Sequence, residues 1–85
     1  MENKVNRLKD KADLFLKEDK RVVVKTYNKD WFFCDILIVG ETRLTIQSFS
    51  GKRTGQTDHI LWIDIYDIEE YLPEEYRIVR GDEGW

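Results

Sequence analysis

Hydrophobic and polar residues recur with the period of an α-helix at the start of the chain. One stripe at helical spacing contains Val5, Leu8, Ala12, Phe15 and Leu16. Asn3 precedes this stripe, and its side-chain oxygen can accept a hydrogen bond from a free N–H group of the first turn. Asp13 and Lys17 have the spacing of an ion pair along a helix. The pattern predicts one amphipathic helix over residues 3–18, ending where the stripe ends, near 18–20.

From residue 21 onward the pattern is that of β-strands. Runs of β-branched and aromatic residues are separated by short segments rich in Asn, Asp or Gly, which favour turns. The runs that predict strands are 21–27, 31–39, 43–49 and 59–63. Residues 64–72 fit both a strand and a helical turn, so we expect a 3₁₀ turn followed by a short last strand around 69–72. Pro73 ends that strand, because proline cannot donate a hydrogen bond to a neighbouring strand.

Residues 31–39 (WFFCDILIV) are apolar at nearly every position. A strand with one solvent-facing side alternates between apolar and polar residues, so a single buried face does not explain this run. A strand that bends through a small barrel, or that the helix also covers, has such a pattern. The next run alternates, and Leu44 and Ile46 are expected to face inward while Thr45 faces outward.

Together these elements predict an all-β fold with one N-terminal helix, namely an SH3-like antiparallel barrel of about five strands. Eighty-five residues form one domain, divided into the helix 3–18, the barrel 21–72 and an acidic tail 73–85. Such a small domain has a thin core, so association with further copies would stabilise it. No apolar run approaches the roughly 18 residues of a membrane span. The N-terminus lacks the apolar segment of a signal peptide, and the single Cys34 excludes an intrachain disulfide, so we expect a cytoplasmic protein in which Cys34 is buried.

Charge is distributed unevenly along the chain. The net charge of −3 argues against nonspecific coating of DNA. Residues 1–30 contain nine Lys and Arg against six Asp and Glu, a net +3, whereas residues 31–85 contain five against eleven, a net −6. Such polarity can orient subunits head to tail or steer a partner to one face, and the alternative interpretation is an ordinary solvated surface.

The order of elements resembles the Sm-like family over roughly residues 3–72. The resemblance is carried by RVVVKTYNKDWFFCDILIVGETRLTI, which sits like the first Sm motif, and by HILWIDIYDIEEY, which looks like the hydrophobic-Trp-Asp-x-x-Ile ending of some divergent prokaryotic Sm-like proteins. It implies a strongly bent five-stranded barrel with a 3₁₀ turn before the last strand, self-assembly, and RNA as the ligand. At 40–43, where the family has Asp-x-x-Met-Asn, this sequence reads Gly-Glu-Thr-Arg, and the Arg-Gly pair of the second motif is absent. The family's usual uridine pocket is therefore not expected here.

Catalytic and metal-binding patterns are missing from the sequence. One histidine, His59, and one cysteine cannot supply a structural zinc site. No nucleophile elbow of the form Gly-x-Ser-x-Gly occurs. The acidic clusters are expected to form a solvated face, because paired carboxylates do acid–base chemistry only where burial or like charge separates their pKa values. We therefore predict a protein that is not an enzyme and that needs no metal or cofactor.

The loop Gly51-Lys52-Arg53-Thr54-Gly55 places two adjacent cations on a hairpin tip. Lys52 and Arg53, together with Arg43, are the candidate RNA-binding residues, because cations on a flexible tip are suited to phosphate. The alternative is a soluble hairpin tip without a ligand. Exposed aromatic residues near these cations would form a base-stacking platform, whereas the ordinary interpretation of 31–33 and Trp62 is a core or a subunit interface.

The segment 59–65 (HILWIDI) is the expected free edge of the sheet, with Leu61, Trp62 and Ile63 as candidate interface residues. Pairing of this edge with another copy would give a head-to-tail contact and, if the rotation closes, a ring. The leading functional prediction is a self-assembling Sm-like protein that binds single-stranded RNA. The alternative is a protein-interaction or scaffold module of the same fold that binds no nucleic acid.

Overall fold

The N-terminal helix α1 runs from Lys4 to Lys17. The structure is a computed structural model, and it describes residues 3–73. Asn3 caps the helix as predicted, since its Oδ1 accepts the backbone N–H of Asn6 at 2.8 Å. The predicted pair of Lys17 and Asp13 is present, with 3.1 Å between Nζ and Oδ2. No helix in the described part of the chain is long and apolar enough to cross a membrane.

The helix ends in a left-handed residue, Asp19, with φ of 55°. The N–H of Asp19 donates to the carbonyl of Leu16 at 3.1 Å, and the N–H of Lys20 donates to the carbonyl of Phe15 at 2.9 Å. These two bonds form the Schellman motif, in which the left-handed residue is usually glycine. The helix therefore stops within the predicted range of residues, and the chain turns directly into the first strand.

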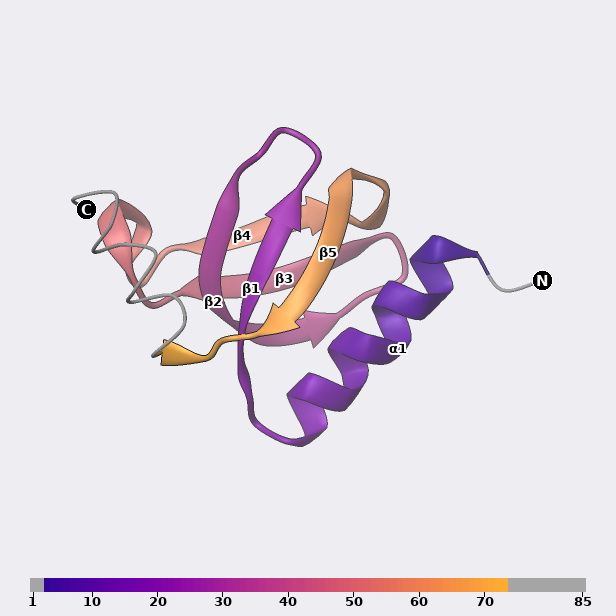
Figure 1. The fold of residues 1–85 in the computed structure, drawn as a ribbon, viewed down its shortest axis with the longest axis horizontal. Helices are drawn as coiled ribbons and strands as arrows, with labels where there is room; N and C mark the ends of the chain where they lie inside the picture. Colours follow the sequence, from indigo (N-terminus) through magenta and orange to yellow (C-terminus); the bar gives the residue numbers. More distant parts are fainter. Residues whose placement is uncertain (1–2, 74–85) are drawn as a thin grey trace.

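Five antiparallel strands follow and form one sheet (Figure 1). Their bounds are Arg21–Thr26 for β1, Trp31–Val39 for β2, Arg43–Ser48 for β3, Thr57–Leu61 for β4 and Ile65–Glu70 for β5. The strand order is β4-β3-β2-β1-β5, so the first four strands form a meander and β5 returns to pair with β1. The predicted β-rich fold with one helix is confirmed. Within residues 3–73 the sheet is not closed, because β4 and β5 are its two outer strands.

Two shifts of register bend this sheet. In β2 the pairing with β3 shifts between Ile36 and Ile38, which leaves Leu37 as an extra residue. In β1 the pairing with β5 shifts between Lys25 and Thr26. An extra residue bends a strand and increases its twist. Figure 1 accordingly shows β3 and β4 crossing behind β1, β2 and β5.

The hydrophobic core lies between α1 and the bent sheet. Its members are Leu8, Ala12, Val22, Val24, Phe32, Cys34, Ile36, Leu44, Ile46, Ile60, Trp62, Ile65 and Ile68. The helix contacts β2, β5 and the 3₁₀ turn between β4 and β5. Val5 and Phe15 pack against this core with part of their surface, whereas Leu16 is 37% exposed. One member of the predicted apolar stripe, Leu16 in the last turn of the helix, is therefore exposed.

The 3₁₀ turn before the last strand, η2, comes earlier than expected, at Trp62–Asp64. The strand that follows begins at Ile65, and not near residue 69. Burial of Trp62 explains the shift, because only 2% of this residue is exposed and its indole N–H donates to the carbonyl of Gly40 at 2.9 Å. The turn brings the indole under the β2–β3 connection, where it has a hydrogen-bond acceptor. The tail predicted at 73–85 lies outside the described residues, apart from Pro73.

Thr45 was expected to face outward, and it does not belong to the core cluster. It is nevertheless buried, with 7% of its surface exposed. Its register partners are Ile38 in β2 and His59 in β4, which flank it on the same face of the sheet. The Thr45 hydroxyl forms a hydrogen bond with Nδ1 of His59 at 2.9 Å. Ile38 and His59 therefore cover Thr45 on the outer face of the sheet.

Candidate functional site

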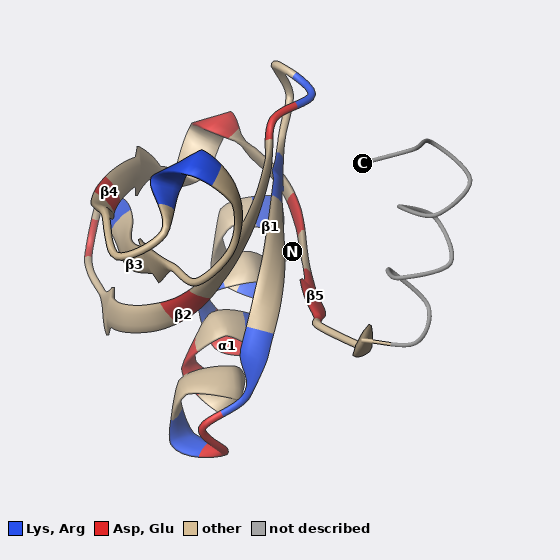
Figure 2. Cartoon of the chain, turned by 90° about the vertical axis from the view of Figure 1, so that its left-hand side faces the viewer, with Lys and Arg blue, Asp and Glu red and all other residues tan. Residues whose placement is uncertain are grey.

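The three cations predicted to bind RNA do not lie together. Lys52 and Arg53 are in the 3₁₀ turn η1 (Gly51–Arg53), which follows β3, whereas Arg43 begins β3. The six residues of β3 span roughly 17 Å at the usual rise per residue, so the strand separates the two positions. Arg43 is instead the register partner of Leu61 in β4. Figure 2 shows the basic residues of η1 as a blue band beside β4.

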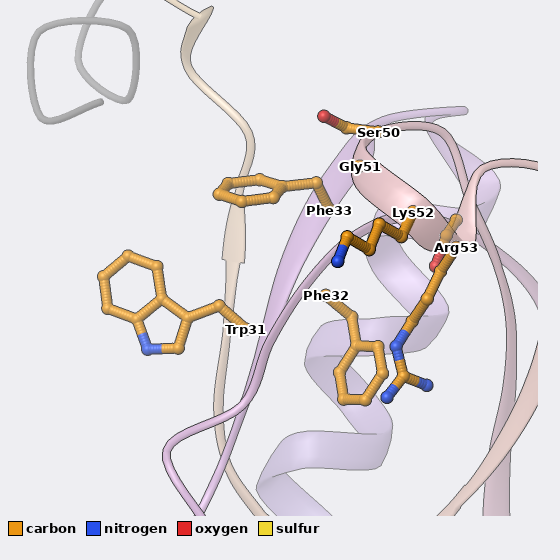
Figure 3. Close-up of a pocket in the computed structure, with 8 residues that line it drawn as sticks. Trp31, Phe32, Phe33, Ser50, Gly51, Lys52 and Arg53 are labelled. Carbon is orange, nitrogen blue, oxygen red and sulfur yellow. The ribbon is translucent and has the colours of Figure 1, made fainter. Parts of the chain in front are cut away.

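A pocket of about 200 Å³ lies between η1 and the start of β2 (Figure 3). β2 contributes Trp31, Phe32 and Phe33, and the β3–β4 connection contributes Lys52 and Arg53 together with hydroxyl and glycine residues. Successive side chains of a strand point to opposite faces. Figure 3 accordingly shows the Phe32 ring turned toward Arg53, and Trp31 and Phe33 turned the other way. The pocket is therefore lined by aromatic rings from both faces of β2.

Arg53 is engaged within the protein. Its guanidinium lies 4.9 Å from the centroid of the Phe32 ring, and its Nη1 lies 3.6 Å from Oδ1 of Asp58. Asp58 is the register partner of the core residue Ile46, so its side chain points to the inner face of the sheet. The Asp58 side chain is 24% exposed, and its Oδ2 is buried with no hydrogen-bond partner in the described part of the chain. The charge of Arg53 thus neutralises an inward-facing carboxylate.

Lys52 differs from its neighbour. Among residues 3–73 its ammonium forms no ion pair and no hydrogen bond. In Figure 3 its side chain reaches back over β2, between Phe33 and Phe32. Ser48 also lines the pocket, and its buried Oγ has no partner within the same range of residues. An uncompensated cation beside aromatic surface and a hydroxyl suits a ligand that combines a phosphate with a flat ring.

Ser48 was not predicted as a site residue. The sequence offers one signal for it, because a serine continues the inward positions Leu44 and Ile46 at the end of β3. A small polar residue at an inward position indicates the end of the apolar core, where a pocket can form. The alternation of residues 31–33 is a second signal, since it places aromatic rings on both faces of β2.

The residues predicted for an oligomer interface divide into two groups. Leu61 and Ile63 are exposed, by 44% and 72%, whereas Trp62 is 2% exposed. Trp62 follows the inward alternation of the core residue Ile60, and its neighbours therefore point outward. Leu61 and Ile63 therefore remain candidates for an oligomer interface. The side chain of Trp62 belongs to the hydrophobic core and has almost no surface available to a partner.

Cys34 is fully buried, as expected from the sequence. Its burial, and to a smaller extent the charge of Asp35, raise the pKa of the thiol to about 12. At neutral pH the thiol is protonated, and a protonated thiol is a poor nucleophile. Within residues 3–73, no three His, Cys, Asp or Glu side chains lie close enough to hold a metal ion.

Comparison of the sequence with models of known protein families and with curated proteins found no match. Assignment of a function therefore depends on the fold and on the pocket beside η1.

Proposed function

We propose that this chain is a non-enzymatic, self-assembling protein of the Sm-like kind that binds single-stranded RNA in the cytoplasm. The observation that carries the RNA-binding part is the pocket beside η1, where the uncompensated ammonium of Lys52 lies over aromatic side chains of β2. Bases stack on aromatic rings in a way that tolerates many sequences, and lysines contact the phosphates between them.

The architecture supports the Sm-like part of the proposal. An N-terminal helix precedes five antiparallel strands, two register shifts bend the sheet, and η2 stands directly before the last strand. These are the features that the resemblance implies. Within residues 3–73 the sheet is open, with β4 and β5 as its outer strands.

The outer strands support the self-assembly part of the proposal. An outer strand has unpaired backbone N–H and C=O groups that can pair with another chain. Leu61 ends β4, and the strongly exposed Ile63 comes two residues later. Pairing of β4 with β5 of another copy would satisfy both edges in a head-to-tail contact.

The test of RNA binding is the salt dependence of affinity in the variant Lys52→Ala. Each lost phosphate contact lowers the slope of log affinity against log salt concentration by about 0.7 for a single strand. We expect this loss for Lys52→Ala, with weaker binding to all sequences. Lys17→Ala removes a cation at the far end of α1 and serves as the matched control, which should leave the slope unchanged. If the native protein has no affinity for RNA at low salt, the RNA-binding part of the proposal is wrong.

The second candidate function is a protein-interaction module of the same fold. It is favoured by Leu61 at the end of β4 and Ile63 in η2, which are 44% and 72% exposed. Exposed apolar residues close together in the chain at a sheet edge favour an interface. A protein that assembles but fails to bind RNA would fit this candidate.

A further inference from the structure

A second groove, next to the pocket at η1, lies at the turn between β1 and β2. Its lining residues include Tyr27, Lys29, Trp31 and Tyr66, and its volume is about 500 Å³. The rings of Tyr27 and Tyr66 meet edge to face, with 5.6 Å between centroids and 83° between planes. Tyr27, Trp31 and Tyr66 are all large and exposed, by 56%, 45% and 55%. Three large aromatic residues with about half of their surface exposed therefore line one groove.

Lysines surround these rings. The ammonium of Lys4 lies 4.6 Å from the centroid of Tyr27 and 4.7 Å from that of Tyr66, and it donates to the Tyr27 hydroxyl. The ammonium of Lys25 lies 4.5 Å from the centroid of Trp31. Lys29 stands in the turn with φ of 69°, and it has no ion pair among the described residues. The groove therefore combines aromatic surface with positive charge.

The positive charge continues onto α1. A third hollow is lined by Lys4, Arg7 and Lys11, which occupy one face of the helix, and by Tyr66. Lys11 pairs with Asp67 at 3.3 Å, whereas Arg7 has no ion pair within residues 3–73. Tyr66 thus lines both the turn groove and this hollow, and Lys4 of α1 lies over the rings of Tyr27 and Tyr66.

The three hollows share residues and form one track. Trp31 lines both the pocket at η1 and the turn groove, and Tyr66 lines both the turn groove and the hollow at α1. Figure 2 shows basic residues in η1, in the β1–β2 turn and along α1. Five of the nine Lys and Arg in residues 1–30 line the track, namely Lys4, Arg7, Lys11, Lys25 and Lys29. Two of the five are ion-paired, Lys11 with Asp67 and Lys25 with Glu69.

We propose that this track, from Lys52 through Trp31 and Tyr27 to Arg7, binds one extended single strand of nucleic acid. The bases stack on the exposed rings, and Lys52, Lys29 and Arg7 contact phosphates at three places along the strand. The proposal deepens the proposed function and rests on it, since it assigns several nucleotides of one strand to a surface much longer than one pocket. A duplex is disfavoured because its bases are stacked on one another and present no free faces to the rings.

A proline-rich peptide also docks in aromatic grooves. It is disfavoured because a peptide of that class has no regular series of anions, whereas the track has cations without ion pairs at three separate places. Cations at three places along the track suit a polyanion better than a neutral chain.

The experiment measures binding of fluorescein-labelled oligo(U) and oligo(A) of 4, 8 and 12 nucleotides by fluorescence anisotropy, with a 12-base-pair RNA duplex for comparison. A single pocket gives an affinity that stops rising once a few nucleotides are present. The track should give an affinity that still rises between 4 and 8 nucleotides, within the roughly 4–16 nucleotides that small β-barrel domains occupy.

The variants test the track residue by residue. Tyr27→Ala combined with Tyr66→Ala should weaken binding of the 8-mer by about tenfold or more and leave the 4-mer less affected, because lost stacking removes the distant contacts. Arg7→Ala should lower the salt slope for the 8-mer. Lys9→Ala and Leu14→Ala, both on the same helix and outside the three hollows, are the matched controls and should bind as the native protein does. Circular dichroism of each variant checks that the fold is kept.

The outcomes separate this inference from the proposed function. If the 8-mer binds, and Lys52→Ala weakens it while the tyrosine variant and Arg7→Ala do not, the track is wrong and the single pocket remains. If no RNA binds to the native protein at low salt, both are wrong. Binding of the duplex as tight as that of the single strand, or saturable binding of a proline-rich peptide in place of RNA, also overturns the track.

Discussion

At the scale of single residues, Lys52 and Arg53 are adjacent cations with different roles. Arg53 turns toward the inner face of the sheet, where it lies over Phe32 and pairs with Asp58. Lys52 turns to the strand edge and remains uncompensated among the described residues. The sequence shows two equal candidates here, because charge alone does not reveal which side chain has an inward-facing carboxylate to neutralise.

Replacing these two residues separately should distinguish their roles. Arg53→Ala removes a partly exposed ion pair and a cation–π contact and leaves the carboxylate of Asp58 without its cation. We expect it to lower the free energy of unfolding by about 1 kcal/mol, which urea denaturation would measure. Lys52→Ala is the matched control and should change stability by less than about 0.5 kcal/mol. Equal stability of the two variants would mean that Arg53 contributes nothing to the fold.

The thiol of Cys34 should make stability depend on pH at the alkaline end. Its pKa rises from an ordinary value near 9 to about 12 in the folded protein, so the folded state holds this proton more tightly than the unfolded chain. The stabilisation is complete below pH 9 and is lost as pH rises from about 9 toward 12, with a slope of at most about 1.4 kcal/mol per pH unit. The comparison is with Cys34→Ala, whose denaturation midpoint should fall less over the same range. If the denaturation midpoints of the two proteins fall equally between pH 9 and 12, the raised pKa of the Cys34 thiol is contradicted.

At the scale of elements, local signals predicted the helix better than the last strand. The cap at Asn3 and the pair of Asp13 and Lys17 depend on residues a few positions apart, and both are present. The position of η2 depends on where the indole of Trp62 finds an acceptor, which is the carbonyl of Gly40 in a distant turn. Tertiary packing of this kind leaves no periodic signal in the residues near Trp62, so the sequence did not reveal the early start of β5.

The end of α1 provides a test of local strain. Asp19 occupies a left-handed conformation that costs free energy for any residue with a Cβ. Asp19→Gly should therefore raise the free energy of unfolding by about 0.5–1 kcal/mol. The same substitution in the middle of the helix, Asp10→Gly, should lower it by a few tenths of a kcal/mol. Thermal melts of the two variants should thus shift in opposite directions, and a loss of stability in Asp19→Gly would contradict the argument.

At the scale of the whole molecule, the two ends of the sheet are the dominant feature. β5 pairs with β1 and not with β4, so β4 and β5 are the two outer strands within residues 3–73. The exposed Ile63 lies in η2, next to both strands in sequence. An open sheet with apolar residues at its edge is expected to associate with another copy or with a partner.

Light scattering over a dilution series tests this association. We expect a mass above that of the 10.2 kDa chain at micromolar concentrations. Ile63→Lys, which places a charge at the edge, should shift the mass toward that of the monomer. Leu14→Lys, at an exposed position of α1, is the control and should keep the native mass. A native protein that remains monomeric at high micromolar concentration and moderate salt would refute self-assembly.

The candidate site was only partly predictable at this scale. The loop containing Lys52 and Arg53 was identified from its composition, whereas Arg43 was grouped with them and lies at the other end of β3. The pairing of Tyr27 with Tyr66 joins the end of β1 to the start of β5, which is a consequence of the strand order. Residues so far apart in the chain give no common pattern, so their meeting required the folded structure.

The contrast between Trp31 and Trp62 gives this protein two intrinsic optical probes. Trp31 is 45% exposed at the junction of two hollows, and Trp62 is 2% exposed with its indole N–H bonded to a carbonyl. In a Trp85→Phe background, acrylamide should quench the emission of Trp31 and leave that of Trp62 nearly unchanged until the protein unfolds. A strand bound along the track would shield Trp31 from the quencher. One emission spectrum would then report occupancy of the surface and integrity of the core as two separate signals, without any attached dye.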